Sequence, residues 1–393
     1  MKFDKYNLSH YFIFLFSILV LLIALPSKLF QNQKSEKVVV LYGHKLYGNL
    51  KSIYLKKLEI NSRVFFLTLD KKYYLKLKEE NVNLLYGLNL KDVIKLVNCK
   101  IFICDHGLHF YKLLIIFKNI IFIDTNHGIP YHKDALNGIN YFSKFDEVWL
   151  MSEYHNKLFE TFDYKGENTK VTGYGRLDNL VQFANKTTHE KDEIILELKN
   201  KYNLISEKII LLAPTWVHEP KILQNKNYPF NKIDFFKELD VIAEKNNFLL
   251  IYRPHMNDYV PKEIISYLNY SENIRLREFK KFTNAEDFLK ISDILITDWS
   301  SIALDYILLD RPVFFLDVPN PFKDGALDDE ILRFGEKIFQ SQLNTKLEVY
   351  INDTDLYFQN NENQKKIKYK IHDIGLDGES ANRYLDTINK YLA

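Results

Sequence analysis

The sequence predicts two α/β domains, each a doubly wound, Rossmann-like parallel sheet facing a shared cleft, with an N-terminal membrane helix ahead of them. The chain has 393 residues, well beyond the roughly 100–150 of a typical single domain. Short apolar runs alternate with helical patterns, stop, and then restart near residue 208. We therefore expect an anchor and basic linker at 1–36, a first domain at 37–184 and a second domain with the closing C-terminal helix at 185–393.

The N-terminal stretch has no Lys, Arg, Asp or Glu between Lys5 and Lys28, and Tyr11–Leu25 is almost wholly apolar. A bilayer core requires about 20 mostly apolar residues, so this stretch is long enough to cross it. A cleaved signal peptide is the alternative, but no clear small-x-small cleavage site is present and Pro26 follows at once. Lysines are denser after the stretch than before it. By the positive-inside rule this predicts a single-pass anchor with the rest of the chain at the cytoplasmic face.

The first domain contains short apolar runs bounded by turn residues, a pattern typical of parallel strands that are covered on both faces. Helical patterns occur at Tyr47–Leu58 and Tyr154–Phe162. The expected strands are Lys37–Tyr42, Arg63–Thr68, Lys100–Cys104, Asn119–Asp124 and Asp146–Met151.

A polar, charged stretch at Asn185–Lys201 joins this series to a second one. There the expected strands are Lys208–Ala213, Asn247–Tyr252, Asn273–Leu276, Asp293–Thr297 and Pro312–Leu316. The expected helices are Phe235–Lys245, Glu286–Ile291, Ser301–Leu309 and Glu379–Leu392. Two consecutive βα series predict two doubly wound sheets with a ligand cleft between them.

Composition excludes several classes of protein and site. Lys and Arg number 53 against 51 Asp and Glu, and a net charge of +2 argues against a nucleic-acid binder. The two cysteines, Cys99 and Cys104, are too few for a disulfide framework, so we expect buried free thiols. Asp298 and Asp305 are compatible with Mg²⁺, but a helix cap and a ribose contact explain them equally well. We predict no fixed metal and no cofactor.

Polar residues directly follow several predicted strands, and ligands of open α/β sheets bind at that edge. His127 and Gly128 follow the strand ending at Asp124. A histidine there is suited to general-base catalysis near neutral pH, and the glycine allows close approach of the backbone to a ligand. The alternative is a loop histidine bonded to a neighbour. A second His-Gly pair, His106-Gly107, shows that such a dipeptide can arise by chance.

Three other segments have a functional and a structural interpretation of similar weight. Arg253-Pro254-His255 offers a guanidinium for phosphate or a stiff turn. Pro214-Thr215-Trp216 offers a hydroxyl or a packed indole. Gly173 to Asp178 offers Arg176 for an anion or a tight turn with a salt pair.

The strand that ends at Thr297 leads into Asp298-Trp299-Ser300-Ser301, with Asp305 one turn further on. Helix N-termini present free N–H groups and attract phosphate. Capping explains one serine of this segment but not the whole set. We therefore favour a diphosphate site here, with Asp298 as cap and support.

Taken in order, these segments resemble the CDP-glycerol glycerophosphotransferase family, the enzymes that prime and polymerise teichoic acids. The resemblance spans Asn126 to Arg383, about two thirds of the chain. The matching segments are His127-Gly128-x-Pro130 with Lys133, Gly173-x-x-Arg176-x-Asp178, Pro214-Thr215-Trp216, Arg253-Pro254-His255, Thr297-Asp298-x-Ser300-Ser301 with Asp305, and Asp377-Gly378 with Ser380 and Arg383.

This resemblance implies a GT-B arrangement and transfer of glycerol phosphate, or a related polyol phosphate, from a CDP-linked donor to a lipid-linked or glycan acceptor. The product would be a teichoic-acid-like or capsular polymer made at the membrane. It implies His127 as general base, His255 as a second essential histidine and CMP as leaving group. The donor-binding positions it implies are Gly128, Arg176, Pro214, Thr215, Arg253, Ser300, Ser301 and Asp305.

Two alternatives stay open, because a fold does not fix a function. One is a GT-B glycosyltransferase that uses a nucleotide sugar. The other is a non-catalytic, membrane-associated binding module, and the presence of both His127 and His255 argues against it.

Overall fold

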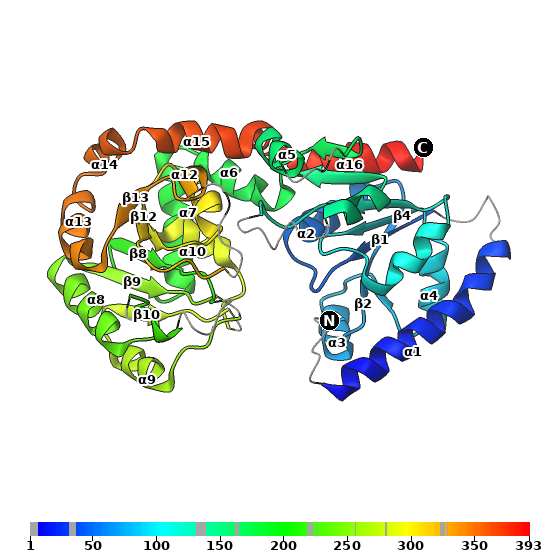
Figure 1. The fold of residues 1–393 in the computed structure, drawn as a ribbon, viewed down its shortest axis with the longest axis horizontal. Helices are drawn as coiled ribbons and strands as arrows, with labels where there is room; N and C mark the ends of the chain where they lie inside the picture. Colours follow the sequence, from blue (N-terminus) through cyan, green and yellow to red (C-terminus); the bar gives the residue numbers. More distant parts are fainter. Residues whose placement is uncertain are drawn as a thin grey trace. The chain divides into compact units, whose positions relative to one another are not determined.

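The computed structural model describes residues 7–30, 37–130, 139–161, 164, 166–217, 223–225, 227–255, 257–279, 281–322, 327 and 329–393. The chain forms two compact units. Unit 1 comprises Met1–Gly128, Gly138–Asp178 and His372–Ala393, and unit 2 comprises Ile129–Asn137 and Asn179–Ile371. Each unit is a parallel sheet with helices around it (Figure 1).

The sheet of unit 1 has seven strands in the order β3-β2-β1-β4-β5-β6-β7, and all pairings are parallel. The five predicted strands are confirmed. The edge strands β3 and β7 have three residues each, too short to give an apolar run in the sequence. The strands are β1 Val38–Tyr42, β2 Arg63–Thr68, β3 Leu84–Tyr86, β4 Ile101–Cys104, β5 Ile121–Asp124, β6 Glu147–Leu150 and β7 Thr169–Val171.

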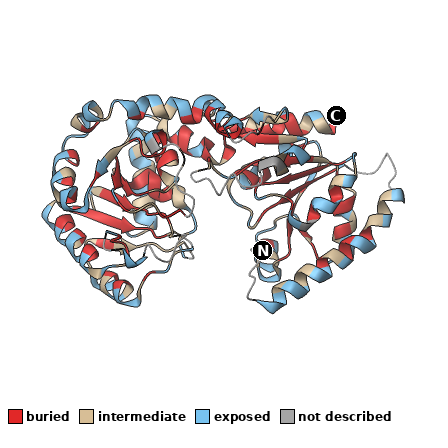
Figure 2. Cartoon of the chain, in the orientation of Figure 1, coloured by how far each residue is buried: buried red, intermediate tan, exposed pale blue. Residues whose placement is uncertain are grey.

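Helices of unit 1 pack against this sheet through apolar faces, and the strands between them are buried (Figure 2). Its main helices are α2 Gly48–Leu55, α3 Lys71–Glu79, α4 Leu90–Val97, α5 Glu153–Glu160 and α16 Ser380–Leu392, with 3₁₀ segments η2 Lys57–Glu59, η3 His109–Ile116, η5 Ile139–Lys144, η6 Gly175–Leu177 and η10 Asp373–Asp377. In the core, the Tyr384 ring of α16 stacks on Trp149 of β6 with centroids 4.5 Å apart. The two cysteines are free and buried, as predicted.

The N-terminal helix α1, Leu8–Ala24, continues as the 3₁₀ segment η1, Leu25–Phe30, and packs along α4 (Figure 1). Ser17, Val20, Leu21 and Ala24 form its buried face. The opposite face is apolar and exposed, and comprises Leu8, Phe12, Leu15, Phe16, Leu19, Leu22 and Ile23. By length and composition, the segment Leu8–Leu29 is sufficient to cross a membrane.

The sheet of unit 2 has six parallel strands in the order β10-β9-β8-β11-β12-β13. The five predicted strands are again confirmed, and the added edge strand β13 has three residues. The strands are β8 Lys208–Leu212, β9 Phe248–Tyr252, β10 Ile274–Leu276, β11 Ile294–Thr297, β12 Val313–Leu316 and β13 Glu336–Ile338.

Helices surround this second sheet and bury an aromatic-rich core around Phe235, Phe236 and Tyr252. The join expected near residue 185 is mostly the helix α7, which starts with a capping box between Thr187 and Glu190. The helices are α6 Asp178–Ala184, α7 Thr188–Lys201, α8 Ile233–Lys245, α9 Lys262–Tyr270, α10 Ala285–Ile291, α11 Ile302–Tyr306, α12 Asp329–Leu332, α13 Leu343–Tyr350, α14 Thr354–Asn360 and α15 Asn363–His372, with η8 Ile307–Leu309 and η9 Gln340–Gln342.

The C-terminal helix departs from the sequence expectation. Residues 372–393 belong to unit 1, whereas the sequence analysis placed them in the second domain. The reason is the apolar face of α16, whose Tyr384, Leu385 and Ile388 are buried in the core of unit 1. Sequence order alone does not show which sheet such a face will cover.

Candidate active site

Four histidines form a row in unit 1, at the edge where the parallel strands end. His44 follows β1, His106 and His109 follow β4, and His127 follows β5. Ring centroids are 5.7 Å apart for His109 and His44, 4.7 Å for His44 and His106, and 4.3 Å for His106 and His127. We call these residues the imidazole row.

His127 is held in one tautomer. Its Nδ1 atom lies 3.0 Å from the backbone carbonyl oxygen of Asp105. A carbonyl only accepts hydrogen bonds, so Nδ1 carries the hydrogen and donates it. In the neutral ring, Nε2 therefore has the free lone pair, which is what a general base requires.

The pKa of His127 lies below its ordinary value. The main cause is desolvation of the ring by surrounding protein atoms, and the next is the positive charge of His106 when protonated. The side chain nevertheless keeps an exposed surface through which a ligand can reach it. Both causes favour the neutral ring near pH 7.

A buried asparagine clamps the backbone around His127. Asn49, at the start of α2, donates from Nδ2 to the carbonyls of Thr125 and Asn126, each at 3.2 Å. Its Oδ1 accepts a hydrogen bond from the backbone N–H of Arg176, also at 3.2 Å. This clamp brings Arg176 close enough for its charge to lower the pKa of His127 slightly. The structure thus brings together two of the residues that the sequence singled out.

In unit 2 the carboxyl ends of β8 and β11 are tied together. The backbone N–H of Thr215 donates to Oδ1 of Asp298 at 2.8 Å, and the Thr297 hydroxyl donates to the carbonyl of Ala213 at 2.7 Å. Burial raises the pKa of Asp298 to about 7. Its contact to Thr215 makes Asp298 a support for the Pro214-Thr215 turn, which is one half of the expected role, whereas the N-cap position of α11 is Ser301.

Ser300 and Ser301 precede α11 as predicted, but the helix is short. It runs for five residues before continuing as 3₁₀ turn η8. Ser301 occupies the N-cap position without a capping hydrogen bond from its side chain. A helix this short contributes little dipole, so the groups here that suit an anion are local N–H and hydroxyl donors. Asp305 lies on this helix and is partly exposed.

His255 has the opposite tautomer to His127. Its Nδ1 accepts a hydrogen bond from the backbone N–H of Asn257 at 3.2 Å, so the neutral ring carries its hydrogen on Nε2. The ring lies roughly parallel to the Trp216 indole, with centroids 6.1 Å apart. Neutral His255 is therefore a hydrogen-bond donor through Nε2, whereas neutral His127 is a proton acceptor.

Arg253 is buried and has structural partners. Its Nη1 atom donates to the carbonyls of Phe282 at 2.8 Å and Arg277 at 3.3 Å, and its guanidinium lies over the rings of Phe279 and Phe288. These contacts hold the loop that follows β10. The structural interpretation of Arg253 therefore has direct support, and a donor-binding role would come in addition to it.

Replacing Arg253 with methionine is expected to lower the free energy of unfolding by about 2–4 kcal/mol, because two hydrogen bonds from a charged donor are lost. Urea denaturation measures this, with the exposed Lys281→Met as matched control. Unchanged stability together with weakened donor binding would show that Arg253 acts on the ligand alone.

The segment Gly173 to Asp178 and the closing segment around Ser380 meet each other in unit 1. The Asp178 carboxylate accepts the backbone N–H groups of Ser380 at 3.1 Å and Ala381 at 2.7 Å. Arg383 Nε donates to the carbonyl of Thr172 at 2.7 Å. Gly173 has φ +74°, and a Cβ there would collide with the Ser380 hydroxyl. These contacts fasten α16 to the rest of unit 1. They give a structural explanation for the glycine, aspartate and arginine in these two segments of the sequence.

Sequence reasoning missed several residues at these edges: Asn49, Asp105, His106, His44, His109 and Arg333. The His106-Gly107 pair looks like a chance dipeptide in the sequence, but the imidazole of His106 stacks on that of His127. Arg333 is buried in unit 2 and lies over the Trp299 ring at 4.5 Å. The missed histidines follow predicted strands, and this position in the sequence could have identified them as candidate ligand-binding residues. Lys133 lies outside the described residues.

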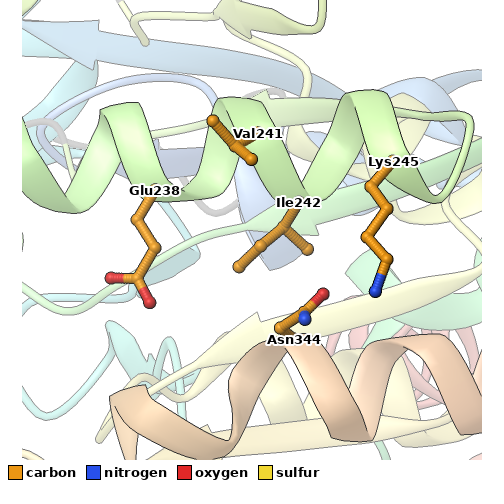
Figure 3. A pocket seen from close by; sticks show the side chains of 5 residues that line it. All are labelled: Glu238, Val241, Ile242, Lys245 and Asn344. Atoms are coloured by element: carbon orange, nitrogen blue, oxygen red, sulfur yellow. The ribbon is translucent and has the colours of Figure 1, made fainter.

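A surface hollow of 390 Å³ lies between α8 and α13 in unit 2 (Figure 3). It is lined by Glu238, Val241, Ile242, Lys245 and Asn344. None of these residues was predicted as a site residue, and Lys245, the one cation in this lining, already pairs with Glu348 at 3.1 Å. In the part of the chain that the structure describes, no group of three or more His, Cys, Asp or Glu is arranged to hold a metal ion.

Comparison with known proteins places these features in a family. A sequence profile of the family described as CDP-glycerol:poly(glycerophosphate) glycerophosphotransferase matches residues 25–318, three quarters of the chain. The chain belongs to this family. The match covers every predicted site residue from His127 to Asp305 and confirms the resemblance seen in the sequence.

Curated relatives in the glycerophosphotransferase family include enzymes of teichoic acid synthesis. The teichoic acid poly(glycerol phosphate) polymerase of Bacillus spizizenii is 30% identical over 50% of this chain and 52% of its own length. The teichoic acid glycerol-phosphate transferase of Staphylococcus aureus is 27% identical over 49% and 51%, and the ribitol-phosphate polymerase TarL of that species is 29% identical over 51% and 33%. The aligned region spans about half the length of the first two of these relatives and about a third of the length of TarL.

Solved structures show the same fold. The wall teichoic acid polymerase TagF, from a crystal soaked with CDPG, superposes with a TM-score of 0.68 at 20% identity and covers 98% of both chains. The UDP-GlcNAc 2-epimerase of Neisseria meningitidis, bound to UDP-GlcNAc, gives 0.58 at 15% identity over 90% of this chain and 100% of its own. At these identities the likeness shows the fold alone, and it confirms the predicted GT-B-like class.

Proposed function

We propose that this chain transfers glycerol phosphate, or a related polyol phosphate, from CDP-glycerol to a lipid-linked or glycan acceptor in the synthesis of a teichoic-acid-like or capsular polymer. Family membership supports the reaction class. The observation that carries the assignment is the fixed tautomer of His127, which leaves Nε2 as a proton acceptor at the ligand edge of unit 1.

In this mechanism an acceptor hydroxyl attacks the phosphorus that bears the glycerol. His127 Nε2 takes the hydroxyl proton as the new oxygen–phosphorus bond forms. The bond to CMP breaks in line, and CMP leaves with the electron pair on its phosphate oxygen. Negative charge spreads over the phosphoryl oxygens, so catalysis depends mainly on positioning and on hydrogen-bond donors.

The donors of unit 2 are proposed to hold the diphosphate of CDP-glycerol. They are Nε2–H of His255 and the hydroxyls of Thr215, Ser300 and Ser301, with Asp305 for the ribose. The Asp298–Thr215 hydrogen bond fixes the turn that carries Thr215. Arg176 of unit 1 adds positive charge near His127. None of these roles requires a metal ion.

The direct test is incubation of the purified chain with radiolabelled CDP-glycerol and a prenyl-diphosphate-linked acceptor, followed by sizing of the products. We expect label in the acceptor and one CMP released for each unit added. CDP-ribitol belongs in the same screen, because relatives include a ribitol-phosphate polymerase. Transfer from UDP-sugars alone would instead support a nucleotide-sugar glycosyltransferase, and persistent absence of turnover a binding module.

We further propose that Leu8–Leu29 anchors the chain in the membrane as a single pass, with both units in the cytosol. The segment is strongly apolar from Tyr11 to Leu25, and the exposed apolar face of α1 has no charged residue. Crossing exchanges the contact of Val20, Leu21 and Ala24 with α4 for contact with lipid, which is equally apolar. Two polar contacts beyond the apolar run fasten its end to unit 1, from Lys28 to the carbonyl of Val97 and from Asn98 to Ser27, both at 3.0 Å.

Cysteine labelling tests this topology. Ser9→Cys at the start of α1 is expected to react with a membrane-impermeant maleimide in intact cells, because a single pass places it outside. The control Asp192→Cys, on exposed α7, should react only after permeabilisation. Background is low because Cys99 and Cys104 are buried. Labelling of both positions only after permeabilisation would mean that α1 lies along the cytosolic surface.

A further inference from the structure

Asp105 contacts two imidazoles of the row at once. Its carboxylate Oδ1 lies 2.7 Å from Nδ1 of His106, and its backbone carbonyl lies 3.0 Å from Nδ1 of His127. The two rings are stacked with centroids 4.3 Å apart and planes within 7° of parallel. Because both Nδ1 atoms are turned to Asp105, both Nε2 atoms lie on the ring edges that face away from it.

The position of the Asp105 carboxylate is built into the fold. It is almost fully buried at the end of β4. Gly43, directly after β1, makes room for it, since a Cβ on residue 43 would lie 2.6 Å from its Oδ1. A nearly buried carboxylate that contacts an imidazole favours the protonated, positively charged ring. Such a ring donates through Nδ1 to Asp105 and carries a second N–H on Nε2.

We propose that His106, oriented by Asp105, is a second imidazole of the reaction centre and donates its Nε2–H to a phosphoryl oxygen beside the hydroxyl that His127 deprotonates. This inference rests on the proposed function. It assigns different tasks to neighbouring rings: His127 accepts a proton, and His106 stabilises negative charge on phosphate. A cation at His106 also keeps His127 neutral, because two charged rings in contact repel each other.

Two replacements of His106 separate this task from a packing role. His106→Phe keeps a flat ring against His127 but has no N–H to donate, whereas His106→Gln loses the ring but keeps an amide donor. We expect the phenylalanine variant to lower kcat about 10²-fold, as removal of one oxyanion donor does, and the glutamine variant to lose less than about tenfold. His189→Phe, on exposed α7, is the matched control and should behave as wild type.

The reverse order overturns the proposal. If His106→Phe turns over normally while His106→Gln is impaired, the ring serves only to pack against His127. Equal, small losses in both variants would also exclude a donor role. Thermal unfolding of each variant shows whether a loss of turnover comes from misfolding, and a misfolded variant is replaced by Asp105→Asn. That change removes the carboxylate but keeps the carbonyl that holds His127, and it should lower kcat in the same way.

Binding can be measured without turnover. NMR of the full chain with isotope-labelled histidines, assigned from the variants above, is recorded with glycerol 3-phosphate and with glycerol as the neutral probe. We expect the Nε2 signals of His106 to shift with glycerol 3-phosphate, because Nε2–H gains a phosphate acceptor, and to stay unchanged with glycerol. If the wild type transfers nothing from any CDP donor, the proposed function fails. The NMR titration would then still decide whether His106 donates a hydrogen bond to a phosphate. Unchanged His106 signals at saturating glycerol 3-phosphate remove the site.

Discussion

Replacing His127 with alanine is expected to lower the turnover of glycerol phosphate transfer about 10²- to 10⁴-fold, the usual contribution of a positioned general base. The variant removes Nε2, the lone-pair nitrogen at the ligand edge of unit 1. It removes little packing, because the side chain is partly exposed. KM for CDP-glycerol should change much less than kcat, since the donor is proposed to bind through unit 2.

The same role predicts a pH dependence. The base acts as the neutral ring, so kcat/KM is retained above the pKa of His127 and is lost as pH falls through it. That pKa lies below 6.5, because desolvation and then His106 oppose protonation of the ring. The acidic limb of the profile should therefore have its midpoint below pH 6.5, and His127→Ala should abolish this limb.

His189→Ala is the control for His127→Ala, because His189 is exposed on α7. It should keep the turnover and the pH profile of the wild type. Near wild-type turnover in purified His127→Ala protein would exclude His127 as the base, whatever the donor proves to be.

Replacing Asp178 with alanine is expected to lower the stability of unit 1 by about 2–4 kcal/mol. Its carboxylate accepts two backbone N–H groups at the start of α16 and thereby caps that helix from another part of the chain. Without the carboxylate, the buried backbone N–H groups of Ser380 and Ala381 lose their hydrogen-bond acceptor. Hydrogen exchange of the α16 amides should accelerate first, because this contact fastens the helix to the sheet.

Asp178→Asn keeps one acceptor oxygen and should lose about half as much stability. Asp192→Ala, at an exposed position of α7, should change stability by less than about 0.5 kcal/mol. If Asp178→Ala were as stable as the wild type but had lost transfer activity, the segment would serve the ligand and our structural explanation would be wrong.

The periodicity of the sequence was sufficient to predict most of both sheets. All ten strands expected from apolar runs are present, because a strand buried on both faces has to be apolar along its whole length. The missed strands β3, β7 and β13 are three-residue edge strands with partly exposed residues, which leave no such run. The order of the strands was not predicted, because apolar runs do not specify which strands pair with one another.

The candidate site was predicted in part, for a related reason. Ligand residues follow strands in open α/β sheets, so His127, Thr215, His255 and Ser300 stood out by position. Position did not show which of them have structural partners. Arg253 and Asp178 have the residue types of a phosphate or substrate site, yet their hydrogen bonds run to backbone groups of their own units.

The sequence by itself determined the two βα series, the apolar N-terminal segment and the family. These depend on local patterns of hydrophobicity and on the order of short motifs. Only the tertiary structure decided that α16 returns to unit 1, that Asp105 holds two imidazoles, and that His127 and His255 have opposite tautomers. Each of these depends on contacts between residues far apart in the chain or on the direction of a hydrogen bond, and neither is encoded in the spacing of residues along the sequence.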